Sequence, residues 1–124
     1  MTMISVDGLD YRIGCLIAGI RAGEVSVYAH QANCMSVFGA GIAPVLAKNF
    51  KELLEADIVC KTSPTNRLGD LTHTPLSSIP IGFNLYGQLY PGRNTDYSAL
   101  DSALEKMNSI LRATGDHHVV GLPK

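Results

Sequence analysis

The sequence predicts an α/β sandwich with a largely parallel sheet at its core. Two observations support this fold class. Short β-branched runs alternate with helical patterns along the whole chain. Hydrophobic residues make up 46% of the 124 residues, which is enough for one buried core and suits one domain better than two. We therefore expect a single domain over residues 1–124, without internal repeats or linkers.

The first half of the chain is expected to begin with two short strands, 3–6 and 10–14, joined at a tight Asp-Gly turn. Apolar residues with helical spacing predict a short helix over 15–24, which a glycine ends. A β-rich run predicts a buried strand over 25–29. Helical patterns then begin at Gly41 and again over 50–57.

The second half begins with a candidate strand over 57–61. The stretch 62–78 holds two prolines, several hydroxyl residues and little periodicity, so we expect it to be mostly loop. Strand patterns return over 79–88 and over 117–123.

The last helix has the clearest pattern. Its apolar residues are spaced 3, 4, 3 and 4 apart, which predicts one buried core stripe. The residues of this stripe are Tyr97, Leu100, Leu104, Met107 and Leu111. Thr95 or Asp96 is expected to cap the first turn, and Gly115 is expected to end the helix.

Charge and cysteine content exclude several classes of protein. The net charge is −1 and the basic residues are scattered, which argues against a nucleic-acid surface. The longest apolar run near the N-terminus is too short to span a bilayer, and no signal peptide is expected. Three widely spaced cysteines predict a reduced, cytoplasmic protein. No cysteine–histidine cluster has ligand spacing, so we expect neither a metal nor a cofactor.

The stretch "AHQANCMSVFGAGIAP", residues 29–44, follows the expected strand 25–29. In open α/β sheets ligands bind beyond the carboxyl ends of the strands. Glycines ahead of a helix let backbone N–H groups approach a phosphate closely, although such glycines can equally form a simple tight turn. A second polar and aromatic stretch, "NLYGQLYPGR", closes the strand 79–88.

These two stretches resemble a known family. "AHQANCMSVFGAGIA" is similar to the ligand loop of macro domains, which bind ADP-ribose, in the short branch reading roughly "VHQVNC…MGAGIA". "NLYGQLYPGRNTDYSALDSALEKM" resembles the second region of that branch, in the same order and spacing. The resemblance covers nearly the whole chain and implies a three-layer α/β/α sandwich with a mixed sheet. The branch includes ADP-ribose-1''-phosphate phosphatases and enzymes that remove ADP-ribose from proteins.

The resemblance also implies roles for individual residues. Asn33 would contact the distal ribose, and His30 matches a histidine proposed as general base in the phosphatases. The residues that would border the phosphates and that ribose are Gly39, Ala40, Gly41 and Ile42. The residues that would help to close the pocket are Tyr86, Gly87 and Gln88. From their chemistry alone, His30 could instead be a structural residue and Asn33 a turn residue. The thiol of Cys34 is expected to be buried and inert.

Two features depart from the family pattern. Cys15 stands where macro domains usually carry an aspartate that binds the adenine amino group. The family also continues past "GLPK" with a block that holds an acidic catalytic residue, so we expect the domain to be incomplete at its C-terminus, and exposed apolar surface there favours self-association. Three functions therefore stay open. They are hydrolysis of an ADP-ribose derivative, binding of ADP-ribose or a related nucleotide without turnover, and a degenerate domain kept for protein contacts.

Overall fold

The computed structural model describes residues 2–5, 8–11, 15–39 and 41–123. The strands are β1 (Thr2–Ser5), β2 (Gly8–Tyr11), β3 (Val27–Asn33), β4 (Leu71–His73), β5 (Ile81–Gln88) and β6 (Val119–Leu122). The helices are α1 (Leu16–Arg21), α2 (Ala43–Asn49), α3 (Lys51–Ile58), α4 (Pro64–Arg67) and α5 (Tyr97–Ala113). Within this part of the chain, none of the helices is long and apolar enough to cross a membrane.

The strands form one sheet in the order β2-β1-β6-β3-β5-β4. The three central strands β6, β3 and β5 are parallel, whereas β1, β2 and β4 pair antiparallel with their neighbours. The predicted mixed sheet is confirmed, but parallel pairing is confined to its centre. The antiparallel pairs β1–β2 and β4–β5 are consecutive elements of the chain, whereas helices stand between the members of the parallel pairs β3–β5 and β3–β6.

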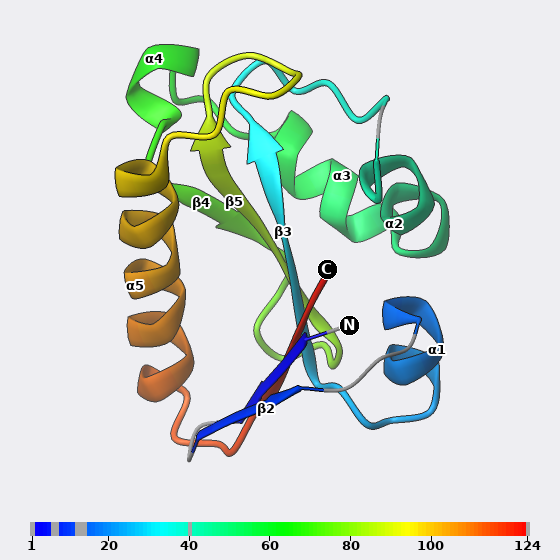
Figure 1. The fold of residues 1–124 in the computed structure, drawn as a ribbon. Helices are drawn as coiled ribbons and strands as arrows, with labels where there is room; N and C mark the ends of the chain where they lie inside the picture. Colours follow the sequence, from blue (N-terminus) through cyan, green and yellow to red (C-terminus); the bar gives the residue numbers. More distant parts are fainter. Residues whose placement is uncertain (1, 6–7, 12–14, 40, 124) are drawn as a thin grey trace.

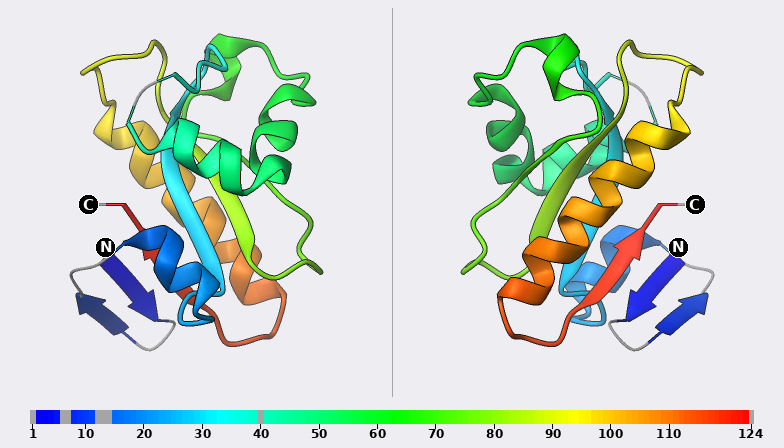
Figure 2. Two further views of the ribbon diagram at one scale, coloured as in Figure 1. Left: turned by 90° about the vertical axis from the view of Figure 1, so that its right-hand side faces the viewer. Right: turned by 90° about the vertical axis from the view of Figure 1, so that its left-hand side faces the viewer.

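Helices cover both faces of the sheet (Figures 1 and 2). Helix α5 lies on one face, and α1, α2 and α3 lie on the other, which confirms the three-layer sandwich. The α5 side of the core contains Val27, Ala29, Ile81, Phe83, Leu85, Ala103, Met107, Leu111 and Val120. The opposite side contains Leu16, Ile20, Val25, Tyr28, Leu46 and Leu53. Because successive strand residues face opposite helices, the central strands are covered on both faces.

Helix α5 begins and ends as its sequence predicts. The Asp96 side chain accepts a hydrogen bond from the Ala99 amide at 3.0 Å, and so caps the first turn. The expected core stripe is only partly right, because Tyr97 is 76% exposed. Small residues instead face the sheet in the first two turns. The buried residues of α5 are Ala99, Ala103, Met107 and Leu111, with Leu100 and Leu104 partly buried beside them.

One expectation for the middle of the chain is wrong, and another is incomplete. Residues 57–61 do not form a strand, because α3 continues to Ile58 and the chain then turns. The apolar residues that suggested a strand, Ile58 and Val59, are 66% and 70% exposed. The stretch 62–78 is mostly loop, as expected, but it also contains the short helix α4 and the edge strand β4, which pairs antiparallel with β5.

Candidate functional site

The two stretches singled out in the sequence meet at one edge of the sheet. We call them the β3–α2 loop (residues 34–42) and the β5–α5 loop (residues 89–96). Both leave the carboxyl ends of neighbouring parallel strands and lie together in Figure 1. The Cys34 amide donates to the carbonyl oxygens of Gln88 and Leu89 at 3.0 and 3.1 Å, which joins the two loops directly.

Asn33 organises the first turn of the β3–α2 loop. Its Oδ1 accepts hydrogen bonds from the Met35 and Val37 amides at 3.1 and 3.2 Å. Its Nδ2 donates to the Val37 carbonyl at 2.8 Å. Ser36, between the two amides, has a φ of 58°, in the left-handed region that non-glycine residues rarely adopt. The Asn33 side chain thus fixes the loop shape from within.

Two glutamines organise the β5–α5 loop. Gln88 Nε2 donates to the carbonyls of Tyr90 and Gly92 at 2.7 and 3.0 Å. Gln31 Nε2 donates to Gln88 Oε1 and, at 2.8 Å, to Thr95 Oγ1. Neither Gln31 nor Thr95 was expected to serve the site, although Gln31 lies on β3 within the motif that resembles the family. Gln88, which was expected to help close the pocket, therefore holds the β5–α5 loop in shape.

Gly87 allows β5 to approach α5 closely. A Cβ atom at Gly87 would lie 3.1 Å from Gln31 Cγ and 3.2 Å from Leu100 Cβ. The Gly87 carbonyl also accepts a 2.7 Å hydrogen bond from the Asp96 amide, which anchors the start of α5. This glycine is needed for packing beneath the site, since its surroundings are protein atoms rather than open space.

The glycines of the β3–α2 loop have open surroundings. Gly41 has a φ of +66°, and a Cβ atom placed there would meet no other atom within 4 Å. At Gly39 the nearest atom would be Val37 Cγ1 at 3.9 Å. Both are exposed, Ile42 is half-buried against the α1–α3 side of the core, and Ala40 lies outside the described residues. The backbone at Gly39 and Gly41 is therefore accessible to an approaching ligand.

His30 is not at the surface. It lies inside β3, because the strand continues to Asn33, and its side chain is only 2% exposed. Its Nε2 lies 2.6 Å from Asn84 Oδ1, and the Phe38 ring packs edge-on against it at 5.4 Å between centroids. Burial lowers the pKa of His30, so the imidazole is held neutral. Its other ring nitrogen, Nδ1, is buried and has no hydrogen-bond partner among the described residues, so neither nitrogen of His30 is exposed to a ligand at the loops.

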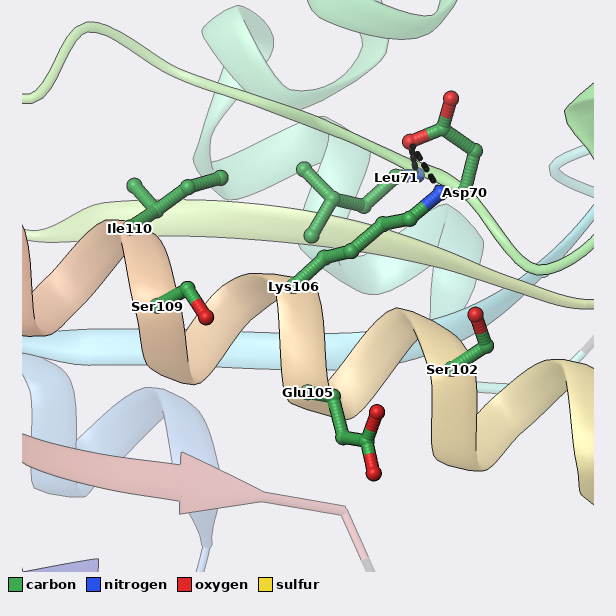
Figure 3. A pocket seen from close by; sticks show the side chains of 7 residues that line it. All are labelled: Asp70, Leu71, Ser102, Glu105, Lys106, Ser109 and Ile110. Atoms are coloured by element: carbon green, nitrogen blue, oxygen red, sulfur yellow. Dashed lines mark hydrogen bonds and ion pairs between the residues drawn. The ribbon is translucent and has the colours of Figure 1, made fainter.

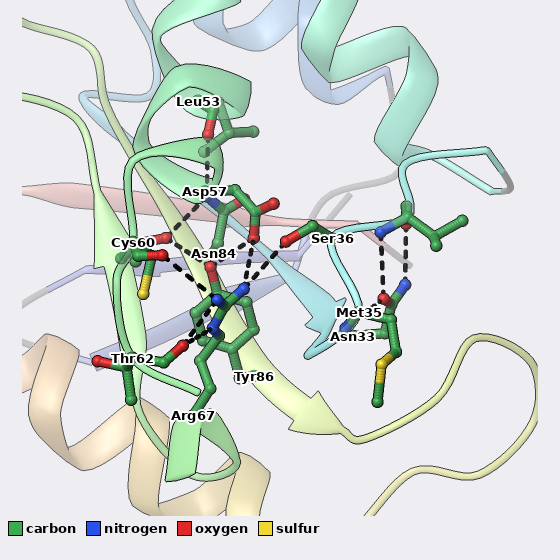
Figure 4. A network of polar contacts seen from close by, with 12 residues as sticks. Asn33, Met35, Ser36, Leu53, Asp57, Cys60, Thr62, Arg67, Asn84 and Tyr86 are labelled. Atoms are coloured by element: carbon green, nitrogen blue, oxygen red, sulfur yellow. Dashed lines mark hydrogen bonds and ion pairs between the residues drawn. The ribbon is translucent and has the colours of Figure 1, made fainter. Parts of the chain in front are cut away.

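Tyr86 also lies in the interior, contrary to the expectation that it helps to close a pocket. It is fully buried, and its hydroxyl donates to Asp57 Oδ1 at 2.6 Å. Burial, together with that carboxylate, raises the pKa of Tyr86. Arg67 lies over the Tyr86 ring, 5.5 Å from its centroid, and its Nη1 is 3.9 Å from Asp57 Oδ1 (Figure 4).

A continuous chain of hydrogen bonds connects Asp57 to His30. Asn84 Nδ2 donates to Thr72 Oγ1 at 3.0 Å and to the Leu53 carbonyl, so Asn84 Oδ1 must accept from His30 Nε2. The Tyr86 hydroxyl donates its proton to Asp57, so it can only accept from the Thr72 hydroxyl, which lies 2.9 Å from Tyr86 Oη. Every bond of the chain runs in one direction, which fixes the neutral tautomer of the histidine with its proton on Nε2.

This polar network was not predicted from the sequence. Asp57 was placed where an expected helix meets an expected strand, and Arg67 and Thr72 were placed in a stretch that was expected to be mostly loop. Asp57 is 1% exposed and Arg67 is 7% exposed, and charged residues are rarely so buried unless they are paired. No local pattern reports a contact between side chains this far apart in the sequence, so only the fold reveals the network.

The cysteines differ in their surroundings. Cys15 is exposed at the N-cap of α1, and Gly14 before it lies outside the described residues. Cys34 is buried, as expected, and burial raises the pKa of its thiol. A less acidic thiol is a weaker nucleophile at neutral pH, which agrees with the expected inert role.

Two cavities in the described part of the chain lie away from both loops. The larger, about 440 Å³, lies between β4 and α5 around the Asp70–Lys106 ion pair (Figure 3). The smaller, about 170 Å³, lies beside Tyr28 and Phe50. Among the described residues, no group of three or more His, Cys, Asp or Glu side chains could hold a metal ion.

Comparison with known proteins gives a relative in sequence and several solved structures with a similar fold. No protein-family model matches the chain. It is 35% identical over 91 residues to an uncharacterized 17.5 kDa protein in the tk-vs intergenic region of Enterobacteria phage T4. That alignment covers 66% of this chain and 56% of the phage protein, so the chain spans little more than half of its relative.

Two of the similar solved structures are macrodomains of DarG proteins. The Thermus aquaticus domain superposes with a TM-score of 0.67 at 17% identity, covering 89% of this chain and 72% of that one. The Mycobacterium tuberculosis domain gives a TM-score of 0.65 at 19% identity, covering 91% and 73%. Together with the parallel β6-β3-β5 centre and the helices on both faces, these superpositions show that the chain has the macrodomain fold.

Proposed function

We propose that this protein binds ADP-ribose or a close derivative between the β3–α2 loop and the β5–α5 loop. The observation that carries the proposal is the direct contact between these loops, made by the Cys34 amide on Gln88 and Leu89. The two stretches that resemble ADP-ribose-binding loops are thus neighbours in space. Their position beyond the carboxyl ends of parallel strands is where α/β folds bind ligands.

In this proposal the backbone of the β3–α2 loop receives the diphosphate. Gly39, Gly41 and Ile42 border the phosphates and the distal ribose, with Ala40 between them. Exposed backbone N–H groups suit an anion, and the open space around the two glycines leaves room for it. Asn33 is the candidate contact to the distal ribose, and its side chain also shapes the loop.

Binding without turnover is favoured over hydrolysis. The candidate base, His30, is 2% exposed, and its basic nitrogen Nδ1 is buried without a hydrogen-bond partner among the described residues. A general base must lie within hydrogen-bond reach of the proton that it removes, directly or through one water. If hydrolysis nevertheless occurs, the His30→Gln variant will separate a catalytic role from a structural one.

We further propose that adenine recognition differs from that of relatives with an aspartate at the position of Cys15. The thiol is a poor acceptor for the adenine amino group, whereas a hydrogen bond to a carboxylate contributes about 1.5–3 kcal/mol. The Cys15→Asp variant should therefore bind ADP-ribose about tenfold more tightly, while its affinity for the inosine analogue changes less. An unchanged ratio of the two affinities would show that Cys15 does not face the base.

The proposal is tested by titration calorimetry with ADP-ribose, using two glycine variants that differ in position but match in strain. Gly41→Val and Gly115→Val both place a β-branched residue at a φ near +70°, with nothing within 4 Å of the new Cβ. Each should lose a comparable amount of stability, roughly 1–2 kcal/mol or more. Only Gly41→Val should lose ADP-ribose binding, because Gly115 ends α5 far from the loops.

Wild-type protein that releases no heat and shows no thermal shift with millimolar ADP-ribose would exclude the proposal. Equal loss of affinity in both glycine variants would point to general destabilisation rather than a blocked site. Tight binding by Gly41→Val would place the ligand elsewhere on the protein.

A further inference from the structure

Ser36 is held in an unfavourable backbone conformation by contacts from two sides. Its φ of 58° lies in the left-handed region, although serine carries a Cβ atom. From within the loop, Asn33 holds the amides of Met35 and Val37. From outside, Arg67 Nη1 donates to Ser36 Oγ at 3.0 Å (Figure 4). A strained residue persists only where its surroundings determine it, so these contacts define the loop.

Arg67 is itself rigidly placed. Its Nε and Nη2 donate to the Thr62 carbonyl at 3.3 and 2.8 Å, and Nη2 also reaches the Cys60 carbonyl at 3.4 Å. Asp57 lies 3.9 Å from Nη1 on the inner side. All three nitrogens of the planar guanidinium therefore donate hydrogen bonds, and Nη1 is the one that reaches the β3–α2 loop.

We propose that Arg67 is a positioning residue that sets the shape of the β3–α2 loop for its ligand, acting through Ser36. The inference rests on the proposed ADP-ribose site and adds a residue to which the family resemblance gives no role. Arg67 does not touch the ligand in this account. It connects the buried Asp57–Tyr86 network to Ser36, whose backbone is strained.

Arginine is required here because its guanidinium donates from Nη1 to Ser36 while Nε and Nη2 donate to the Thr62 carbonyl. Lysine carries one nitrogen, so it can stay near Asp57 or reach Ser36 but cannot reproduce the bonds to Thr62 at the same time. An ordinary hydrogen bond is worth roughly a threefold to tenfold change in an equilibrium constant. We therefore expect Ser36→Ala and Arg67→Lys each to weaken ADP-ribose binding by about threefold to tenfold.

The experiment is a double-mutant cycle of Ser36→Ala and Arg67→Lys, with ADP-ribose affinity measured by calorimetry. If both residues act through one link, the double variant should bind about as well as the weaker single variant. Ser109→Ala and Arg112→Lys are the matched controls, because both side chains are exposed on α5, and both should bind like the wild type.

Affinity losses that multiply in the double variant would overturn the proposal, because they would show that Ser36 and Arg67 act independently. Wild-type affinity in Ser36→Ala would overturn it as well, and would leave the ADP-ribose site standing. Ser36→Ala keeps the buried Asp57–Arg67 pair, so it should fold even where Arg67→Lys does not.

Amide hydrogen exchange separates this inference from the proposed function. The Met35 and Val37 amides should exchange faster in Ser36→Ala than in wild type, whether or not a ligand is present, because the loop has lost its outer support. Unchanged exchange at both amides would refute the positioning role. Faster exchange in a protein that does not bind ADP-ribose would refute the proposed ligand and confirm only that Arg67 orders the loop.

Discussion

The hydroxyl of Tyr86 should contribute a large share of the protein's stability, and the Tyr86→Phe variant measures it. Phenylalanine keeps the ring that packs under Arg67 and fills the same space. What is lost is the 2.6 Å hydrogen bond to Asp57 Oδ1, together with the acceptor for the Thr72 hydroxyl. Asp57 Oδ2 already has no partner among the described residues, so the carboxylate would keep only Arg67 at 3.9 Å.

The size of the effect follows from the burial of the carboxylate. A hydrogen bond to a charged group contributes about 1.5–3 kcal/mol, and leaving a buried partner unsatisfied moves the cost to the upper part of that range. We expect a loss of about 2–3 kcal/mol in the free energy of unfolding. With about 2.1 cal/mol/K of unfolding entropy per residue over 124 residues, the melting temperature should fall by about 8–12 °C.

The assay is thermal unfolding followed by circular dichroism, with Tyr90→Phe as the control. Tyr90 is 58% exposed, so loss of its hydroxyl should change stability by no more than about 0.5 kcal/mol. A Tyr86→Phe melting temperature within the range of the control would refute the reasoning. It would mean that water, rather than Tyr86, satisfies the buried carboxylate.

Three further predictions concern stability. Burial lowers the pKa of His30 in the folded protein. The contribution of His30 to the free energy of unfolding is therefore complete above its unfolded pKa of about 6.5. It is lost as pH falls towards the folded pKa, by up to about 1.4 kcal/mol per pH unit. Urea titrations from pH 8 to 5 should show a shallower decline in His30→Gln, and equal slopes would contradict this. Gly82→Ala should cost about 1–3 kcal/mol by chemical denaturation, because its Cβ would lie 2.4 Å from the Tyr28 hydroxyl. Gly39→Ala is its control, and a matching loss there would exclude the clash as the cause. Asp96→Ala should lose about 0.5–2 kcal/mol and Asp96→Asn much less, since asparagine also caps helices. Equal losses in the two Asp96 variants would show that the capping bond is not what stabilises α5.

The main layers of the fold could be predicted because they depend on local patterns. Alternating and helical periodicities identified β5 and α5, and the Asp96 cap agreed with them. The edge strand β4 was missed because its three residues are half-buried and two of them, Thr72 and His73, are polar. The false strand at 57–61 arose because Ile58 and Val59 have strand propensity but lie exposed at the end of α3.

The sequence placed the two candidate loops at neighbouring strand ends, as the structure does, but it did not predict the orientation of His30 and Tyr86. Residues within a parallel strand are covered by helices on both faces, so only those at or beyond its carboxyl end reach the ligand edge. His30 and Tyr86 lie inside β3 and β5, and both point into the polar network under α3. Asn33 ends its strand, and the glycines follow it into the exposed loop. A motif match fixes which segments form a site, whereas the strand boundaries decide which side chains face it.

The most direct test of the central claim is a titration of isotope-labelled protein with ADP-ribose, followed by NMR of the backbone amides. We expect saturable shifts in the β3–α2 loop and the β5–α5 loop, including Val37, Gly39 and Gly41. We expect little change around the remote cavity between β4 and α5, at Lys106 for example. Shifts confined to that cavity, or no saturable shift at millimolar ADP-ribose, would contradict the claim that these two loops form an ADP-ribose site.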